Sequence, residues 1–310
     1  MVKKENGSKS EILDLVIIGF GPAGYTASIY SSRYKIPHVI IGKQIGGQAG
    51  EAHLIENYPG FIKISGMELS MKFREHALSF GAKEVMDEVI KVSRKDGKFV
   101  TETRSGDTFL SKTVLVAIGT KKRKLNVPGE DKFYGKGVTY CATCDGPFYK
   151  GKIVGVVGGG DAANTSSLYL ADIAKHVHQF VRRDVLRGEP VWHERVKENP
   201  KITLHFNTKI SQIVGKDKLE KVILEDGREL KLDGLFIEIG SVPDTSILKD
   251  LGVDLDEGGY IKVNRDQSTN IPGLYAAGDV TDGSNKFRQI TTAVGEAAVA
   301  ANSIMEYLKR

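Results

Sequence analysis

Near its N-terminus the chain reads Leu15-Val16-Ile17-Ile18-Gly19-Phe20-Gly21-Pro22-Ala23-Gly24, and this stretch decides the fold. The four apolar residues predict a buried strand, and residues 25–32 after the glycines are compatible with a helix. In such a unit the first glycine allows a tight turn, the second lets backbone approach a pyrophosphate, and the third lets helix pack on strand. Phosphates then lie at the helix N-terminus, where free N–H groups favour anions. The stretch therefore predicts a dinucleotide site.

The same pattern occurs a second time in the middle of the chain. Residues 153–157 predict a strand, the turn is Gly158-Gly159-Gly160-Asp161-Ala162-Ala163, and residues 164–174 have helical apolar spacing. Alanine in place of the last glycine is compatible with the motif. One copy alone could be a structural glycine turn, but two copies in this context predict two nucleotide-binding units and two cofactors.

The two copies differ at the end of the strand that follows each helix. Residues 39–43 contain no Asp or Glu that could bind a ribose 2′-hydroxyl, whereas residues 177–181 are followed by Arg182, Arg183 and Arg187. An NAD site favours a carboxylate at this point, and an NADP site favours arginine, whose planar fork pairs with the 2′-phosphate. The second copy therefore predicts an NADPH site, although an exposed basic helix start would also explain the arginines.

Only two cysteines occur, Cys141 and Cys144, in one Cys-x-x-Cys. A structural zinc site usually has four ligands, commonly from two such pairs, and the seven histidines show no local His-x3-His spacing. In a reducing compartment a single pair of this kind is more often catalytic than structural. The pair therefore predicts redox chemistry, while a metal site or incidental thiols stay open.

The composition is that of an ordinary globular protein with an excess of glycine. Of 310 residues, 40% are hydrophobic, 27% are charged and 35 are glycine. This length favours two domains. No stretch approaches the roughly 20 apolar residues of a membrane helix. The polar N-terminus lacks the apolar core of a signal peptide. We therefore expect a cytoplasmic protein that does not bind a membrane.

The net charge of +5 is mild for this length, and basic residues cluster at 121–124. We interpret this cluster as an exposed basic loop. A nucleic-acid site would need more basic surface and an aromatic or helix-turn-helix context, neither of which occurs. The sequence therefore predicts no nucleic-acid partner.

Further segments complete the expected fold. Residues 273–280 predict a late strand and turn, followed by Arg288-Gln289 and a helix over 293–308. Asp226-Gly227 between two apolar runs predicts a hairpin. Trp192, the only tryptophan, is expected to serve packing. The remaining predicted strands cover residues 202–206, 222–224 and 235–239.

Taken together, these residues resemble the low-molecular-weight thioredoxin reductases, which are flavoproteins dependent on FAD and NADPH. The resemblance covers nearly the whole chain, from about residue 15 to 308. Its most specific motif is Cys141-Ala142-Thr143-Cys144-Asp145-Gly146, because larger pyridine-nucleotide disulfide reductases carry their cysteine pair soon after the first glycine turn. It also includes both glycine turns, the arginines after the second, and residues 46–48, 56–60, 117–120, 277–279 and 288–289.

The resemblance implies an α/β fold of two Rossmann-like domains, doubly wound and three-layered. A discontinuous FAD-binding domain would comprise residues 1–121 and 247–310. The NADPH-binding domain, residues 122–246, would be inserted between its parts and would carry the cysteine pair. Crossings near 119–122 and 241–246 would serve as hinges for a large rotation of the NADPH domain.

The resemblance also implies ligand-binding residues. The lack of an acid at Lys43 is compatible with it, since some members of the family also lack one there. FAD would contact Gly19, Gly21, Pro22, Ala23, Gly24, Gly42, Gln44, Gly47, Gln48, Asn57, Gly278, Asp279, Arg288 and Gln289. NADPH would contact Gly158, Gly160, Asp161, Ala162, Arg182, Arg183 and Arg187.

By resemblance, the chain would be an NADPH-dependent thioredoxin-disulfide reductase and a homodimer, with no metal. Cys144 would face the flavin, and Cys141 would attack a thioredoxin or glutaredoxin-like protein. Asp145 would be the acid–base group that protonates and deprotonates the departing thiol. In an Asp-Gly-Pro sequence it could instead be a turn residue.

Four positions depart from the family pattern. Val181 replaces a frequent histidine, Asp161 adds a negative charge near the expected pyrophosphate, and Thr165-Ser166 replace acidic residues. These departures leave open a same-fold flavoprotein that uses NADH, reduced ferredoxin or another electron donor. The sequence is also compatible with a flavoprotein of a peroxide-reducing system, an oxidase, a redox sensor or a zinc scaffold.

Overall fold

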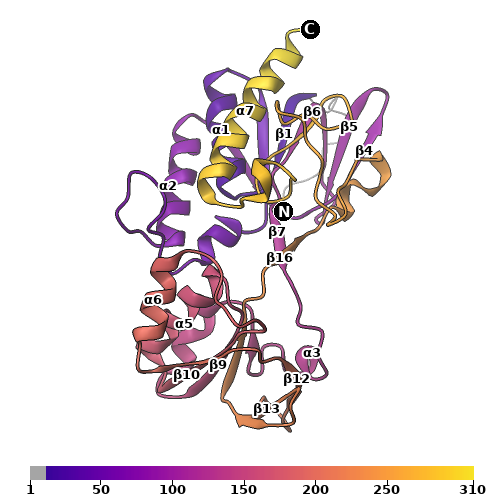
Figure 1. The fold of residues 1–310 in the computed structure, drawn as a ribbon. Helices are drawn as coiled ribbons and strands as arrows, with labels where there is room; N and C mark the ends of the chain where they lie inside the picture. Colours follow the sequence, from indigo (N-terminus) through magenta and orange to yellow (C-terminus); the bar gives the residue numbers. More distant parts are fainter. Residues whose placement is uncertain (1–11) are drawn as a thin grey trace, which may run out of the picture. The chain divides into compact units, whose positions relative to one another are not determined.

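The computed structural model describes residues 12–310, which fold as two compact units (Figure 1). The first unit comprises residues 12–50, Glu56–Thr120 and Pro243–Arg310, and the second comprises Glu51–Ile55 and Lys121–Val242. Each unit is an α/β structure built on parallel strands, which confirms the predicted fold class. Within the described part of the chain, every helix is too short or too polar to cross a membrane.

The first unit is built on a seven-stranded sheet of order β3-β2-β1-β6-β5-β4, with β17 beside β6. Strands β1, β2, β3, β6 and β17 are parallel, whereas β4, β5 and β6 form an antiparallel meander. The strands are β1 (Leu13–Ile18), β2 (His38–Gly42), β3 (Lys83–Met86), β4 (Val89–Lys95), β5 (Lys98–Thr103), β6 (Thr108–Val116) and β17 (Leu274–Ala276). The helices are α1 (Pro22–Arg33), α2 (Gly66–Ser79) and α7 (Ile290–Leu308), with 3-10 turns η1 (Gly47–Glu51), η3 (Ser246–Leu251) and η4 (Ser284–Lys286).

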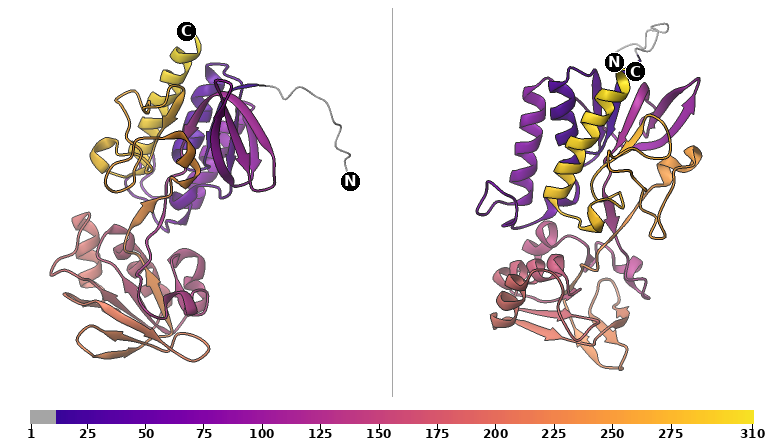
Figure 2. Two further views of the ribbon diagram at one scale, coloured as in Figure 1. Left: turned by 90° about the vertical axis from the view of Figure 1, so that its right-hand side faces the viewer. Right: turned by 45° about the horizontal axis from the view of Figure 1, so that its top comes forward.

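The two faces of this sheet have separate cores, because successive side chains of a strand point to opposite faces. Leu15 and Ile17 pack with residues of α1, α2 and α7, and Val16 and Ile18 pack with residues of β4 and β5. Helix α1 lies between α2 and α7 on the helical face (Figure 2). The Ser65 hydroxyl caps α2 by accepting a hydrogen bond from the Glu68 backbone N–H at 3.2 Å. The helices α1, α2 and α7 therefore pack together on one face of the central strands, and β4 and β5 pack on the other.

The second unit has a five-stranded parallel sheet of order β11-β10-β9-β15-β8. Helix α5 packs on one face, and a three-stranded antiparallel sheet, β12-β13-β14, covers the other. Gly227, with φ of +83°, makes the predicted hairpin between β13 and β14. The strands are β8 (Val138–Thr139), β9 (Ile153–Val157), β10 (His176–Phe180), β11 (Ile202–His205), β12 (Ile210–Val214), β13 (Lys221–Leu224), β14 (Glu229–Lys231) and β15 (Gly234–Ile237). The helices are α3 (Glu130–Phe133), α4 (Ala142–Asp145), α5 (Asp161–Ile173) and α6 (Pro190–Glu198), with a 3-10 turn η2 (Gly146–Tyr149).

The chain passes between the units twice, in strands β7 (Thr120–Lys122) and β16 (Ser241–Pro243), which pair with one another. The predicted strands and helices are confirmed, with ends that shift by a few residues. The interpretation of residues 121–124 as an exposed loop is wrong for Lys122, which is half-buried at the end of β7. The last helix begins at Ile290 rather than 293, because the Gln289 and Thr292 side chains form a capping box. The meander over β4 and β5 was not among the predicted strands.

Candidate functional site

The first glycine turn connects β1 to α1, and two of its glycines are required by close backbone packing. A Cβ on Gly19, whose φ is +122°, would lie 2.2 Å from the carbonyl oxygen of Ala117. A Cβ on Gly24 would lie 1.9 Å from the carbonyl oxygen of Gly19. Beside Gly21, in contrast, no described atom other than its chain neighbours lies within 4 Å of that position. The turn therefore leaves open space at the start of α1, where backbone N–H groups can meet phosphate.

The late glycine turn after β17 meets the first turn at the same edge of the sheet. Strand β17 runs parallel to β6, and the Ala277 N–H donates to the carbonyl oxygen of Val116 at 3.0 Å. A Cβ on Gly278, whose φ is +80°, would lie 3.2 Å from the Ala23 Cβ. The turns after β1, β2, β6 and β17 thus share the carboxyl edge of the sheet, where nucleotides bind in open α/β folds.

Asp279 and Arg288 are half-buried polar residues at this edge. Burial raises the pKa of Asp279 to about 6, with the nearby Arg288 acting in the opposite direction. The guanidinium of Arg288 lies 3.8 Å from the centroid of the Tyr260 ring, and its Nε donates to the Asp279 carbonyl oxygen at 3.4 Å. Its Nη2 is buried without a hydrogen-bond partner among the described residues. A buried, unpartnered guanidinium nitrogen beside open space fits a bound polar cofactor such as FAD.

Glu296 on α7 holds the late turn in place, a role that the sequence did not indicate. Its carboxylate accepts hydrogen bonds from the Gly278 backbone N–H at 2.7 Å and from the Ser284 hydroxyl at 2.6 Å. The Thr281 hydroxyl lies 3.3 Å from the same carboxylate. Glu296 is buried, so these bonds are what makes its charge tolerable.

The remaining predicted FAD residues lie in the first unit, some in the segment 42–48 and the others at Asn57 and Gln289. The segment 42–48 reaches the first turn, because the Gly46 N–H donates to the carbonyl oxygen of Phe20 at 2.8 Å. A Cβ on Gly42 would lie 2.6 Å from the Phe20 ring, and one on Gly47 would lie 3.9 Å from the Gly21 Cα. Gln44 donates to the Gly47 carbonyl at 3.5 Å, Gln48 donates to the Thr120 hydroxyl at 2.8 Å, and Asn57 donates to Gln289 Oε1 at 3.2 Å.

The second glycine turn, between β9 and α5, repeats the build of the first. A Cβ on Gly158 would lie 2.2 Å from the carbonyl oxygen of Glu238, whereas no described atom lies within 4 Å of that position beside Gly160. A Cβ on Gly159 would lie 2.7 Å from Val181 Cγ1. Val181 is buried, so the residue that replaces the family's histidine packs against this turn. The open space beside Gly160 fits a second nucleotide.

Asp161, the first residue of α5, directs its carboxylate toward the loop that follows β10. Its Oδ1 accepts a hydrogen bond from the Glu189 backbone N–H at 2.8 Å. Arg182, Arg183 and Arg187 on this loop are exposed, and within residues 12–310 none of them forms an ion pair. Their guanidinium groups are therefore accessible to a phosphate.

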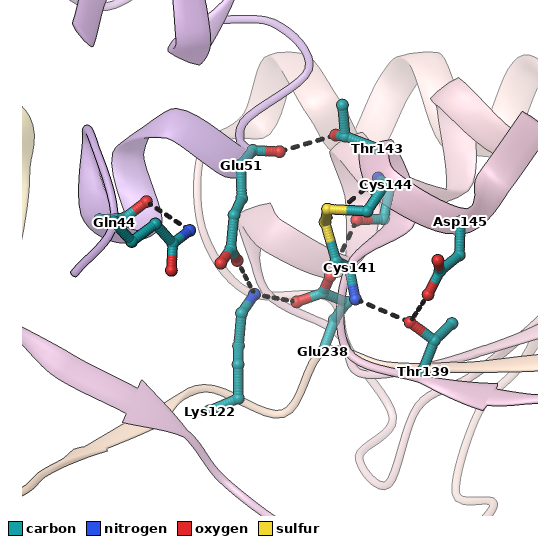
Figure 3. Close-up of a disulfide and its surroundings, with 11 residues drawn as sticks. Gln44, Glu51, Lys122, Thr139, Cys141, Thr143, Cys144, Asp145 and Glu238 are labelled. Atoms are coloured by element: carbon teal, nitrogen blue, oxygen red, sulfur yellow. Dashed lines mark hydrogen bonds and ion pairs between the residues drawn. A yellow bond between two sulfur atoms is a disulfide. The ribbon is translucent and has the colours of Figure 1, made fainter. Parts of the chain in front are cut away.

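Cys141 and Cys144 form a disulfide in the second unit, with their Cα atoms 5.4 Å apart (Figure 3). Cys141 caps the short helix α4, and its Sγ accepts a hydrogen bond from the Cys144 N–H at 3.2 Å. After reduction, this N–H would stabilise a thiolate at position 141, because hydrogen bonds to the charged form of a group favour that form. Cys144 is exposed and Cys141 is half-buried.

Asp145 follows the disulfide directly and is held by Thr139. The Thr139 hydroxyl donates to Asp145 Oδ2 and accepts a hydrogen bond from the Cys141 backbone N–H at 3.2 Å (Figure 3). One hydroxyl thus connects the carboxylate to the backbone of the first cysteine. The sequence singled out Asp145 but gave no signal for Thr139.

A buried charge pair near the disulfide was not predicted either. Lys122 Nζ lies 2.9 Å from Glu238 Oε2 and 3.7 Å from Glu51 Oε2 (Figure 3). The Ser166 hydroxyl lies 3.3 Å from Glu238 Oε1. Burial raises the pKa of Glu238, and the Lys122 ammonium opposes this shift. The Thr143 hydroxyl donates to the Glu51 carbonyl oxygen at 2.7 Å, so contacts lead from the cysteine helix to this pair.

Within residues 12–310, no three His, Cys, Asp or Glu side chains form a group that could hold a metal ion.

Comparison with known proteins agrees with this geometry. Residues 13–297 match the family described as pyridine nucleotide-disulphide oxidoreductase. A curated thioredoxin reductase of Mycoplasma genitalium is 39% identical over 301 residues, covering 95% of this chain and 95% of the relative.

Solved structures give the same result. The crystal structure of Lactococcus lactis thioredoxin reductase superposes with a TM-score of 0.91 at 36% identity, covering 96% of this chain and 99% of that one. A ferredoxin-flavin thioredoxin reductase from Clostridium acetobutylicum has a TM-score of 0.53 at 36% identity, covering 97% of this chain and 99% of that one. The predicted resemblance is confirmed: the chain belongs to the pyridine nucleotide-disulphide oxidoreductase family, on the branch of the low-molecular-weight thioredoxin reductases, whose cofactors are FAD and NADPH.

Proposed function

We propose that the chain reduces the disulfide of thioredoxin or of a glutaredoxin-like protein with electrons from NADPH. The observation that carries this proposal is the Cys141–Cys144 disulfide on the same unit as an open glycine turn and three exposed arginines. When bound, NADPH supplies hydride and FAD passes electrons from hydride to a disulfide.

We assign the two cofactors to separate parts of the chain. Residues 1–121 and 247–310 would form the FAD-binding domain, and residues 122–246 would form the NADPH-binding domain. The unpartnered Arg288 nitrogen and the open space at Gly21 support the first assignment. The open space at Gly160 and the exposed arginines support the second. We propose that the crossings near 119–122 and 241–246 act as hinges between them.

The cysteines would carry out thiol–disulfide exchange once they are reduced. The Cys141 thiolate attacks one sulfur of the substrate disulfide, and a mixed disulfide forms as the other substrate sulfur leaves. The Cys144 thiolate then attacks Cys141 Sγ, which releases the reduced substrate and restores the Cys141–Cys144 disulfide. The hydrogen bond from the Cys144 N–H to Cys141 Sγ supports position 141 as the attacking thiolate.

Asp145 would act as the general acid and base in this exchange. A leaving thiolate is released more readily when a nearby acid protonates it, and a thiol attacks after a base has removed its proton. Thr139 holds the Asp145 carboxylate next to the backbone of Cys141, which supports this role. We also propose that the chain acts in the cytoplasm, where thiols are kept reduced, and that it forms a homodimer.

A second candidate differs only in the electron donor. The similar Clostridium acetobutylicum protein is described as a ferredoxin-flavin thioredoxin reductase, and the histidine of the family's arginine motif is Val181 here. Steady-state reduction of thioredoxin with NADPH, NADH or reduced ferredoxin separates the candidates. The proposal expects saturation with NADPH at the lowest concentration, and complete loss of turnover in Cys144→Ser. Turnover with ferredoxin but not with NADPH would refute the proposed donor.

A further inference from the structure

We propose that Asp161 is a positioning residue that sets the dinucleotide preference of the second unit. It would do so by holding the segment 182–189, here called the arginine loop, in the conformation that presents its three arginines. The proposal rests on the proposed use of NADPH.

Hydrogen bonds fix the arginine loop at both ends. At its start, the Asn207 N–H donates to the Arg183 carbonyl oxygen at 3.0 Å. At its end, the Arg187 N–H donates to the Gly159 carbonyl oxygen at 2.6 Å, and Asp161 Oδ1 accepts from the Glu189 N–H at 2.8 Å. The bond to Asp161 involves a carboxylate, and charge-assisted bonds are stronger than neutral ones. Asp161 is therefore a principal anchor of the loop.

Gly188 shows how closely the loop backbone fits the carboxylate. Its φ is +100°, and a Cβ built there would lie 2.0 Å from Asp161 Oδ1 and 2.6 Å from Asp161 Oδ2. No side chain fits between the two, so the Asp161 carboxylate occupies the space beside this turn of the loop. Asp161 and Gly188 thus depend on one another for the observed conformation.

A buried polar pair supports the same junction from inside the unit. Gln179 is fully buried, and its Nε2 donates to the Gly158 carbonyl oxygen at 3.1 Å and to Asn164 Oδ1 at 2.9 Å. The Asn164 Nδ2 in turn donates to the Arg187 carbonyl oxygen at 3.4 Å. The glycine turn, helix α5 and the arginine loop are therefore one connected hydrogen-bonded structure.

Asp161 could act on dinucleotide binding in two ways, and the two predict opposite changes in affinity when Asp161 is removed. If Asp161 positions the loop, its loss should weaken contact with the 2′-phosphate, which only NADP carries, and spare NAD. If its charge instead repels the pyrophosphate, its loss should strengthen both dinucleotides equally, because both contain that group. The bond to Glu189 turns the charge toward the loop, which favours the positioning effect.

The test measures the dissociation constants of NADP⁺ and NAD⁺ for the FAD-loaded full chain by titration calorimetry. Asp161→Ala should weaken NADP⁺ roughly tenfold, as expected for one charge-assisted hydrogen bond. The same variant should leave NAD⁺ within about twofold. Asp161→Asn keeps an oxygen that can accept from Glu189 and should retain the preference of the unsubstituted chain. Asp184→Asn removes a charge from the exposed part of the same loop and is the matched control.

Trp192 gives a readout that does not depend on the nucleotide. It is the only tryptophan, and its Nε1 donates to Glu189 Oε2 at 3.1 Å. Its emission should shift in Asp161→Ala and stay unchanged in Asp161→Asn.

Three results would overturn the proposal: tighter binding of both dinucleotides in both Asp161 variants, equal weakening of both in Asp161→Ala, or unchanged emission in Asp161→Ala. An unsubstituted chain without preference for NADP⁺ would instead contradict the proposed donor, and the Trp192 emission would still judge whether Asp161 holds the loop.

Discussion

The two glycine turns of this protein are built alike but completed differently. In both, the first glycine packs against a backbone carbonyl, and a later glycine, Gly21 or Gly160, faces open space. Beside the first turn lies the turn at Gly278, which is distant in sequence and is held in place by Glu296. Beside the second turn lies the arginine loop, which follows the next strand, and Asp161 holds this loop in place.

This difference shows what a glycine motif specifies and what it leaves to the rest of the fold. The motif itself sets the close approach of helix to strand and the space for a phosphate. The groups that would distinguish one nucleotide from another come from other segments, each fixed by one buried or half-buried carboxylate. The two sites therefore differ mainly in the anchoring acid and in the segment that this acid holds.

The largest expected effect comes from alanine substitutions that separate packing glycines from space-providing ones. Gly24→Ala places a Cβ 1.9 Å from the Gly19 carbonyl oxygen and should destabilise the first unit by about 3 kcal/mol or more. Gly21→Ala meets no such contact, so the flavin-free variant should keep its thermal midpoint. The same variant, when purified or offered FAD, should fail to hold flavin. Gly160→Ala should keep flavin and lose NADP⁺ binding.

Thermal unfolding of the flavin-free proteins and the flavin-to-protein absorbance ratio measure these effects. Full flavin retention in Gly21→Ala would show that FAD does not lie along the first turn. Loss of flavin in Gly160→Ala would remove the distinction between the two turns.

The next effect concerns the buried pair of the second unit. Lys122→Met should destabilise the chain by about 3 kcal/mol at pH 7.5, because it leaves the buried Glu238 carboxylate without its cation. Burial raises the pKa of Glu238, so the destabilisation should shrink as the pH falls and the carboxyl takes up its proton. Lys124→Met breaks the exposed pair with Asp131 and should change stability far less than Lys122→Met does.

Denaturant unfolding at two pH values tests this expectation. A Lys122→Met variant as stable as Lys124→Met at pH 7.5 would mean that Glu238 does not need its partner.

The smallest effects are pH dependences of opposite sign in the two units. The folded pKa of Asp279, about 6, lies above its ordinary value of 3.8, so its contribution favours folding at low pH and is lost as the pH rises through 6. The folded pKa of His178, about 4, lies below its ordinary value of 6.5, because of burial and the neighbouring His205 and His176. Its contribution is therefore present above pH 6.5 and is lost as the pH falls toward 4.

Two variants separate these contributions in flavin-free protein. Relative to the unsubstituted chain, Asp279→Asn should gain about 2 kcal/mol as the pH rises from 4 to 7. His178→Gln should gain stability as the pH falls over the same range, because the folded pKa of His178 lies below its ordinary value. Parallel pH profiles for the two variants would contradict the assigned environments.

Much of this organisation was predictable from sequence, and the exceptions have a common cause. Both glycine turns, the arginines and the cysteine pair are short motifs whose residues are close in sequence, so the pattern alone identified them. The contacts of Glu296 with Gly278, of Lys122 with Glu238, and of Asp161 with Glu189 join separate elements, and an isolated acid gives no signal of its partner.

Two further features escaped prediction for related reasons. Residues Glu51–Ile55 belong to the second unit although the chain around them belongs to the first, and no change of composition marks them. Strand β4 carries the exposed charged residues Lys91, Arg94 and Lys95, and β5 buries Thr101 and Thr103, so the apolar alternation of both strands is weak in the sequence.

The most direct test of the account follows electrons in one sample. Anaerobic titration of the FAD-loaded chain with NADPH, with flavin absorbance and free thiols recorded together, should yield two thiols per chain from the single disulfide. The Cys144→Ser variant should show flavin reduction and no new thiols. Flavin that NADPH reduces while the Cys141–Cys144 disulfide of the unsubstituted chain stays intact would contradict the account, as would flavin that NADPH does not reduce at all.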